Sequence, residues 1–142
     1  MSEQVEAHKA VALKFLTQAH KGEVALEDLY TPGYVHHNEA FYPGLEPGFD
    51  NFKRALASGA GGISDLQVRV DHLIGEGDKV VARFTLTGRH SGTFQGIPAT
   101  GRVVTFSATD IYRFENGRIA EGWAMMDFLA FLRQVSDREG GQ

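Results

Sequence analysis

The stretch DIYRFENGRIAEGWAMMD, residues 110–127, contains the strongest structural signal in the chain. Within it, Asn116-Gly117 lies between two apolar-rich runs. This dipeptide favours the two-residue type I′ turn of a β-hairpin, because both central residues of that turn need a positive φ. Antiparallel strands are therefore expected on either side of the turn, with Glu115 opposite Arg118.

A regular register about this turn also determines which side chains share a face of the sheet. It places Tyr112 opposite Glu121 and Asp110 opposite Trp123. One face then combines carboxylates and a phenol with bulky apolar groups: Phe106, Ala108, Asp110, Tyr112, Phe114, Ile119, Glu121, Trp123, Met125 and Asp127. Such a mixture is typical of a ligand pocket. The opposite face, with small and hydroxyl side chains, favours contact with a flat partner, so we expect a homodimer.

Length and composition indicate one domain over residues 1–142. The net charge of −4 and the dispersed basic residues argue against a nucleic-acid partner. Without cysteine, the chain has no disulfide, thiolate nucleophile or cysteine metal site. No run approaches the roughly 20 apolar residues of a membrane span, and the acidic N-terminus is unlike a signal peptide. We therefore expect a cytoplasmic protein with no membrane partner.

The apolar spacing changes from helical to strand-like along the chain. Helices are expected over residues 3–20, 26–29 and 49–56, with a loop over 39–48. Strands are expected over residues 66–71, 80–88, 102–114 and 119–126, and a closing helix over 128–135. This order predicts an α+β fold, in which a curved antiparallel β-sheet forms a cone and the N-terminal helices enclose a cavity.

Several segments, in this order and spacing, match a known family. They are Tyr34-Val-His-His with Pro43-Gly44, Gly75-Glu-Gly-Asp-Lys-Val-Val, Gly88-Arg-His-Ser-Gly-Thr-Phe-Gln-Gly-Ile-Pro-Ala-Thr-Gly, and the hairpin of residues 110–127. With them the whole chain resembles the SnoaL-like polyketide cyclases of the NTF2-like superfamily. The resemblance implies an NTF2-like cone that catalyses ring closure by intramolecular aldol condensation, without a cofactor. Asp127 matches the catalytic aspartate of that family, whereas Arg113 stands where cyclases of established activity have a histidine.

Asp127 has two interpretations. A carboxylate removes a proton next to a carbonyl effectively when an apolar pocket raises its pKa toward the working pH, and Trp123, Met125 and Phe128 are candidates for that pocket. Asp127 also directly precedes the predicted closing helix, where its carboxylate would accept backbone N–H groups as an N-cap and its pKa would fall. The resemblance favours the catalytic interpretation.

His36 and His37 are further catalytic candidates. They are adjacent in an extended segment, so only one of them can face the cavity. A neutral imidazole there would hydrogen-bond and polarise a substrate carbonyl. The alternative for either residue is a surface histidine or a core histidine with satisfied nitrogens. No close-spaced ligand motif indicates a metal site, so none is expected.

The remaining candidates are expected to line the pocket and bind substrate: His90, Asp110, Tyr112, Trp123, Phe41, Phe84, Phe94 and Met125. A buried Asp110 would need a partner such as a tyrosine hydroxyl or the indole N–H. Glu121, near the turn, is expected to be solvated or paired with an arginine instead.

Three functions remain open on the sequence alone. The first is a cyclase-type enzyme acting by proton abstraction on a small, hydrophobic, carbonyl-rich molecule. The second is a hydrolase or isomerase on the same scaffold, because a fold does not determine a reaction. The third is a non-catalytic small-molecule-binding or dimerisation module, which would bind a ligand unchanged or have a cavity filled by side chains.

Overall fold

The helices lie at both ends of the sequence, as the apolar spacing predicts. The computed structural model describes residues 2–136. Its helical elements are α1 (Ser2–Gln18), η1 (Ala19–Lys21), η2 (Leu26–Asp28), α2 (Phe49–Ala60) and α3 (Phe128–Ser136). None of the helices in the described part is long and apolar enough to cross a membrane.

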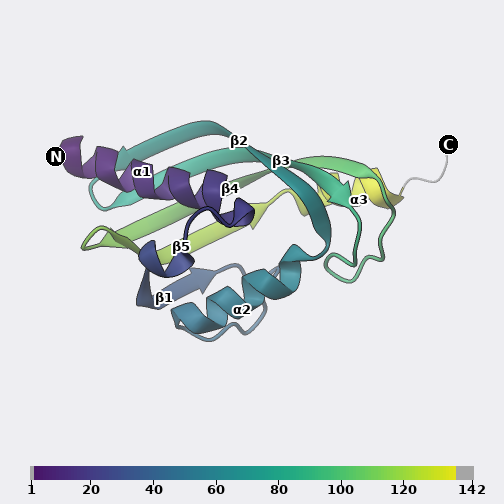
Figure 1. Cartoon of the computed structure of the whole chain (residues 1–142), viewed down its shortest axis with the longest axis horizontal. Coiled ribbons are helices and arrows are strands. Elements are labelled where there is room, and N and C mark those ends of the chain that lie inside the picture. Colours follow the sequence, from purple (N-terminus) through teal and green to yellow (C-terminus); the bar gives the residue numbers. More distant parts are fainter. Residues whose placement is uncertain (1, 137–142) are drawn as a thin grey trace.

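The strands form one curved sheet in the order β1-β5-β4-β3-β2 (Figure 1). They are β1 (Tyr30–His37), β2 (Ile63–Glu76), β3 (Lys79–His90), β4 (Val103–Glu115) and β5 (Arg118–Met126). Strands β2 to β5 are antiparallel neighbours, as expected, whereas β1 pairs with β5 in parallel. The sequence did not indicate β1 because Pro32-Gly33 interrupts it. An edge strand tolerates a proline, and the pairing of β1 is irregular between Tyr30 and Val35.

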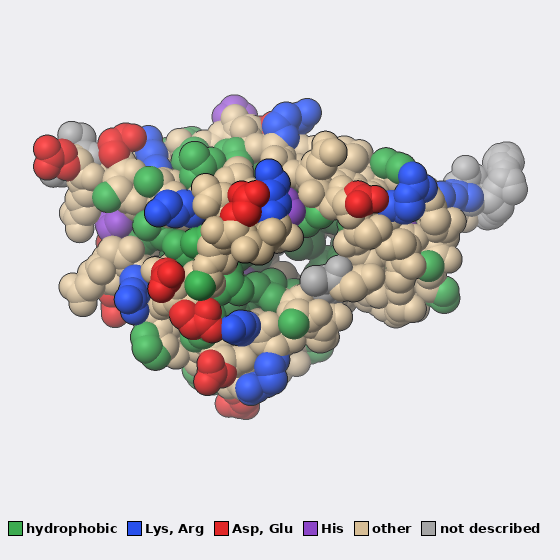
Figure 2. Space-filling model, in the orientation of Figure 1, with side chains coloured by type: hydrophobic (Ala, Val, Ile, Leu, Met, Phe, Trp, Pro, Cys, Tyr) green, Lys and Arg blue, Asp and Glu red, His purple; other side chains and the backbone are tan. Residues whose placement is uncertain are grey.

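Both N-terminal helices cover the same face of the sheet. α1 packs on β2 and β3, and α2 packs on β1 (Figure 1). Alternate residues of β3 and β4 are buried beneath these helices, which is the period-2 pattern of a sheet with one covered face. Figure 2 shows hydrophobic side chains at the bottom of a hollow between α1 and α2. The predicted α+β cone is confirmed.

The hairpin that connects β4 to β5 begins as predicted. Asn116 and Gly117 have φ values of 51° and 82°, and Glu115 pairs with Arg118. Beyond the turn, however, the regular register predicted from the sequence is wrong. Phe114 pairs with Ile119 but Arg113 pairs with Glu121, so Ala120 is an extra residue that forms a β-bulge in β5.

The bulge reverses the faces of the rest of β5. Tyr112 pairs with Gly122 and Asp110 pairs with Ala124, so these small residues share the covered face with the phenol and the carboxylate. Trp123 and Met125 lie instead on the uncovered face. The covered face has no room for larger side chains here, because the Tyr34 hydroxyl occupies the space where a Cβ of residue 122 would be.

This contact predicts the effect of Gly122→Ala. The added methyl group would overlap the Tyr34 hydroxyl, so we expect a loss of about 1–3 kcal/mol in the free energy of unfolding, measured by urea denaturation. Gly61→Ala is the matched control, because a Cβ at Gly61 would meet nothing within 4 Å. Equal stability of the two variants would contradict the close approach of Tyr34 to β5.

Candidate active site

Asp110 is the carboxylate at the centre of the covered face. It lies in the middle of β4 between Ala82 of β3 and Ala124 of β5, and only 9% of its surface is exposed. The Tyr112 hydroxyl donates a hydrogen bond of 2.8 Å to Asp110 Oδ2. The predicted need of Asp110 for a polar partner is therefore met by a tyrosine. Within residues 2–136, Oδ1 has no hydrogen-bond donor, so it is available to a ligand.

Burial changes the acidity of this group. It raises the pKa of Asp110 from 3.8 to about 6, although the hydrogen bond from Tyr112 lowers the pKa and partly opposes the effect of burial. A carboxyl group with a pKa near 6 can both accept and return a proton close to neutral pH. The sequence pattern had indicated Asp110 as a substrate-binding residue only.

All four tyrosines of the chain surround Asp110 closely enough to interact with its charge: Tyr30, Tyr34, Tyr42 and Tyr112. Burial raises the pKa of each tyrosine, and the negative charge of Asp110 raises it further. Each tyrosine therefore remains a neutral phenol at neutral pH. The sequence does not predict Tyr30, Tyr34 or Tyr42 as site residues, although Tyr34 lies in a segment that matches the family.

His36 is the histidine of β1 that points inward. Its ring centroid lies 4.5 Å from that of Phe52, and its Nδ1 is 2.6 Å from the Tyr34 hydroxyl. Burial lowers the pKa of His36 to about 4, and the neighbouring His37 contributes to this effect, so the imidazole is uncharged at neutral pH. A neutral imidazole carries one N–H, and when the Tyr34 hydroxyl donates to Nδ1 this proton lies on Nε2. No group within residues 2–136 hydrogen-bonds that nitrogen.

His37 points to the uncovered face and belongs to a charged network. It stacks on Trp123 with ring centroids 5.2 Å apart, and its Nε2 lies 2.7 Å from Glu121 Oε2. Arg113 Nε donates to the other oxygen of Glu121 at 2.9 Å. The hydrogen bonds from His37 and Arg113 lower the pKa of Glu121. The expected arginine pairing of Glu121 is thus confirmed.

Two residues predicted to line the pocket lie on the uncovered face with this network. Trp123 is half-buried against His37, and Met125 is 75% exposed. The bulge at Ala120 is the reason, since it turns both side chains away from Asp110. The structure therefore does not bring them together with the other predicted pocket residues.

Asp127 is exposed at the start of α3. Its Oδ1 accepts a hydrogen bond of 3.1 Å from Ala130 N, which is the geometry of a helix N-cap. Its own backbone N–H donates to Ser107 O at 2.9 Å. The capping interpretation of Asp127 is confirmed, and its catalytic role remains a prediction from the resemblance.

The other predicted pocket residues lie along the covered face. Phe84 on β3 pairs with Ala108, two residues from Asp110. His90 is fully buried, with Nε2 donating to Ile97 O at 3.1 Å and Nδ1 lying 3.0 Å from Thr100 Oγ1. His90 thus holds the loop after β3 with both ring nitrogens.

Phe41 and Phe94 belong to an aromatic cluster under α3. Their ring centroids are 5.9 Å apart, and that of Phe94 lies 5.0 Å from that of Phe131. This cluster forms an apolar wall at the end of the covered face. Within the part of the chain described, no group of three or more His, Cys, Asp or Glu side chains could hold a metal ion.

Comparisons with known proteins agree with this architecture. The family model described as SnoaL-like polyketide cyclase matches residues 10–135. A comparison with curated proteins found no match. Among solved structures, TsrD from Streptomyces laurentii is 32% identical, with a TM-score of 0.76, and the alignment covers 95% of this chain and 96% of TsrD.

Two further solved structures share the fold. IdmH from Streptomyces antibioticus, a candidate polyketide cyclase, is 24% identical with a TM-score of 0.78, and the alignment covers 92% of this chain and 99% of IdmH. AclR from Streptomyces galilaeus, a candidate hydroxylase, is 23% identical with a TM-score of 0.79, covering 93% and 97% of the two chains. Different reactions are therefore ascribed to proteins with this fold.

The raised pKa of Asp110 predicts how stability depends on pH. Between pH 3.8 and about 6 the folded chain binds more protons at this site than the unfolded chain, so the contribution of Asp110 to stability falls as the pH rises through this range. Asp110→Asn removes the charge but keeps an acceptor for Tyr112. At pH 8 we expect this variant to be more stable than the parent by up to about 3 kcal/mol, since each pKa unit is worth about 1.4 kcal/mol.

The measurement is urea denaturation of the parent and of Asp110→Asn at several pH values from 4 to 8. Asp127→Asn is the matched control, because it removes the same charge while asparagine remains a good N-cap. An Asp110→Asn variant that is destabilised equally at pH 5 and pH 8 would contradict a desolvated carboxyl group.

Proposed function

Because the chain belongs to the SnoaL-like polyketide cyclase family, we propose that it catalyses acid–base chemistry on a small, hydrophobic, carbonyl-rich molecule, without a cofactor. The observation that carries this proposal is the buried Asp110, which is hydrogen-bonded by Tyr112 and has a pKa of about 6. The neutral tyrosines and the uncharged His36 around it supply hydrogen-bond donors in a mostly apolar surrounding. One carboxylate with neutral hydrogen-bond donors in an apolar surrounding suits the formation of an enolate better than a reaction that needs several charged catalytic groups.

In the proposed reaction, the Asp110 carboxylate removes a proton from the carbon next to a substrate carbonyl. The C–H electron pair forms the enolate, whose negative charge develops on the carbonyl oxygen. The enolate carbon then attacks a second carbonyl carbon of the same molecule, a C–C bond closes the ring, and the second carbonyl oxygen becomes an alkoxide. Asp110 returns its proton to this alkoxide, so the enzyme is regenerated without any co-reactant.

His36 is the proposed stabiliser of the enolate oxygen, and Tyr34 holds its ring in place. A donor fixed in a desolvated site stabilises a developing negative charge more strongly than water does. The hydrogen bond between Tyr34 and His36 Nδ1 holds the imidazole so that Nε2–H remains available for the substrate. Burial keeps His36 neutral, so it acts as a hydrogen-bond donor and not as a competing acid.

Asp127 is the alternative acid–base residue, proposed from the resemblance. Its carboxylate would have to leave the cap of α3, or share it, to reach a substrate. Asp110 needs no such change, because it already lies among the predicted pocket residues. We therefore assign the proton transfer to Asp110.

A proton-exchange assay tests this assignment without knowledge of the natural substrate. Aryl ketones such as 1-tetralone are incubated with the protein in D₂O, and deuterium uptake next to the carbonyl is followed by NMR. Asp110→Asn should lower the catalysed exchange at least about 100-fold, the usual contribution of a general base, whereas Asp127→Asn should stay within about threefold of the parent. The parent rate should rise with pH and level off above about pH 6.

The opposite ranking of the two variants would assign the base to Asp127. A parent protein that binds aryl ketones without exchanging their protons would favour a non-catalytic binding module. Asp110→Asn and Asp127→Asn remove the same charge, so a difference between them reports position and not net charge.

We also propose that the uncovered face of the sheet joins two copies of the chain. Three large hydrophobic side chains on this face are strongly exposed: Ile74 at 61%, Val103 at 58% and Met125 at 75%. Ile74 pairs with Val81, which shows that it lies on the same side as the outward residues of β3. Ile74, Val81, Ile111 and Trp123 pair in turn across β2, β3, β4 and β5, so apolar side chains form a row on this face that favours a partner.

The dimer proposal predicts that Met125→Lys shifts the protein from dimer to monomer in analytical ultracentrifugation. The introduced charges would be buried without partners at the interface, which is costly. Leu129→Lys is the matched control, because Leu129 is similarly exposed at 56% but lies on α3. A parent protein that is monomeric at high concentration would contradict the proposal.

A further inference from the structure

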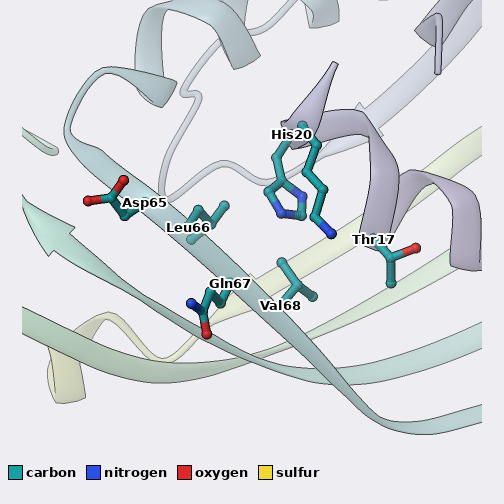
Figure 3. Close-up of a pocket in the computed structure, with 7 residues that line it drawn as sticks. Thr17, His20, Asp65, Leu66, Gln67 and Val68 are labelled. Atoms are coloured by element: carbon teal, nitrogen blue, oxygen red, sulfur yellow. The ribbon is translucent and has the colours of Figure 1, made fainter. Parts of the chain in front are cut away.

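A concave site lies between the end of α1 and the start of β2, and Asp110 is not among the residues that line it (Figure 3). This groove has a volume of about 630 Å³, which is within the usual range for small-molecule sites. Its lining residues are Thr17, His20, Lys21, Asp65, Leu66, Gln67 and Val68. Val68 pairs with Leu86, which pairs with Phe106, four positions along β4 from Asp110. At about 3.3 Å per residue, the groove therefore lies about 13 Å from Asp110 along the strand direction.

The floor of the groove is apolar. Leu66 and Val68 are half-buried against the core, and in Figure 3 their side chains point toward His20 and Thr17. The backbone before them is irregular, because Asp65 has a φ of 53° and the pairing of β2 shifts between Ser64 and Gln67. Non-glycine residues rarely adopt a positive φ, and such bulges often re-aim side chains next to binding sites.

The upper wall of the groove is polar and carries a positive charge. Lys21 is exposed and forms no ion pair with any residue in the range 2–136. His20 lies beside it. Burial is the main cause of the lowered pKa of His20, and the positive charge of Lys21 lowers it further. The Asp65 carboxylate points away from His20 in Figure 3, so it does not neutralise this wall.

We propose that this groove binds a hydrophobic carboxylate. The carboxylate pairs with the Lys21 ammonium group and accepts a hydrogen bond from the His20 imidazolium, whose other N–H donates to the Leu66 backbone, while the hydrocarbon part covers Leu66 and Val68. The site uses none of the groups assigned to proton transfer. It is therefore a separate binding function of the chain.

The proposal has a consequence for pH dependence. A bound carboxylate next to His20 favours the charged imidazolium, so binding raises the pKa of His20 and the affinity is higher at pH 6 than at pH 8. The charged groups that act on His20 are Lys21, which opposes its protonation, and Glu23, which favours it, whereas the carboxylate of Asp65 on the neighbouring strand points away.

The test uses 2-naphthoate as the probe, with calorimetry for affinity and NMR titration of the His20 ring for its pKa. Methyl 2-naphthoate has the same rings without the charge and should bind at least about threefold more weakly. Lys21→Ala should weaken naphthoate binding by a similar factor and leave ester binding unchanged. Lys14→Ala, which removes an equal charge from an exposed position of α1 outside the groove, should have no effect.

Three results would overturn the proposal: equal affinity for acid and ester, insensitivity to Lys21→Ala, or no change in the pKa of His20 at saturation. The Asp110→Asn variant separates this site from the proposed active site. It should bind 2-naphthoate as the parent does, whereas a changed affinity in this variant would place the probe next to Asp110 and contradict the groove.

Discussion

The bulge at Ala120 is the constraint on which the interior of this protein depends. With one extra residue in β5, the small residues Gly122 and Ala124 lie beneath the helices beside Tyr112 and Asp110. A regular strand would place Glu121 and Trp123 there instead, and their volume would exclude the Tyr34 hydroxyl from the position that it occupies. The bulge therefore makes space for the phenols around Asp110, and it sends the charged and bulky residues of β5 to the other face.

The buried carboxyl group of Asp110 does not serve the stability of the fold. A carboxyl group that burial holds at a pKa of about 6 destabilises the folded chain above that pH, because its charged form is incompletely solvated. A leucine or valine in the middle of β4 would avoid this cost. Only one of the carboxylate oxygens receives a hydrogen bond from the residues of the described chain, that from Tyr112. A partly satisfied, desolvated acid is the arrangement that proton transfer requires, and stability is commonly reduced at such sites.

Local signals in the sequence predicted most of the fold but not the arrangement of the site. The turn at Asn116-Gly117, the antiparallel strands and the helices follow from residue spacing and turn chemistry. The parallel strand β1 does not, because Pro32-Gly33 is typical of a turn and only pairing with β5 makes it a strand. The bulge cannot be predicted from the sequence either, since an alanine such as Ala120 also occurs in regular strands. A one-residue shift exchanges the two faces, so this single omission moved Trp123 and Met125 into the predicted pocket.

The two faces of the sheet have different electrostatic environments, and adjacent residues of one strand lie on opposite faces. His36 is buried and uncharged against Tyr34, whereas His37 lies outside in a network with Glu121 and Arg113. Arg113 therefore cannot replace an interior histidine on β4, and the proposed donor to the substrate, His36, lies on β1 instead. Proteins with this fold include candidate cyclases and a candidate hydroxylase, so the fold leaves the reaction open. The neutral donors and the single acid of the covered face are what favour enolate chemistry in this chain.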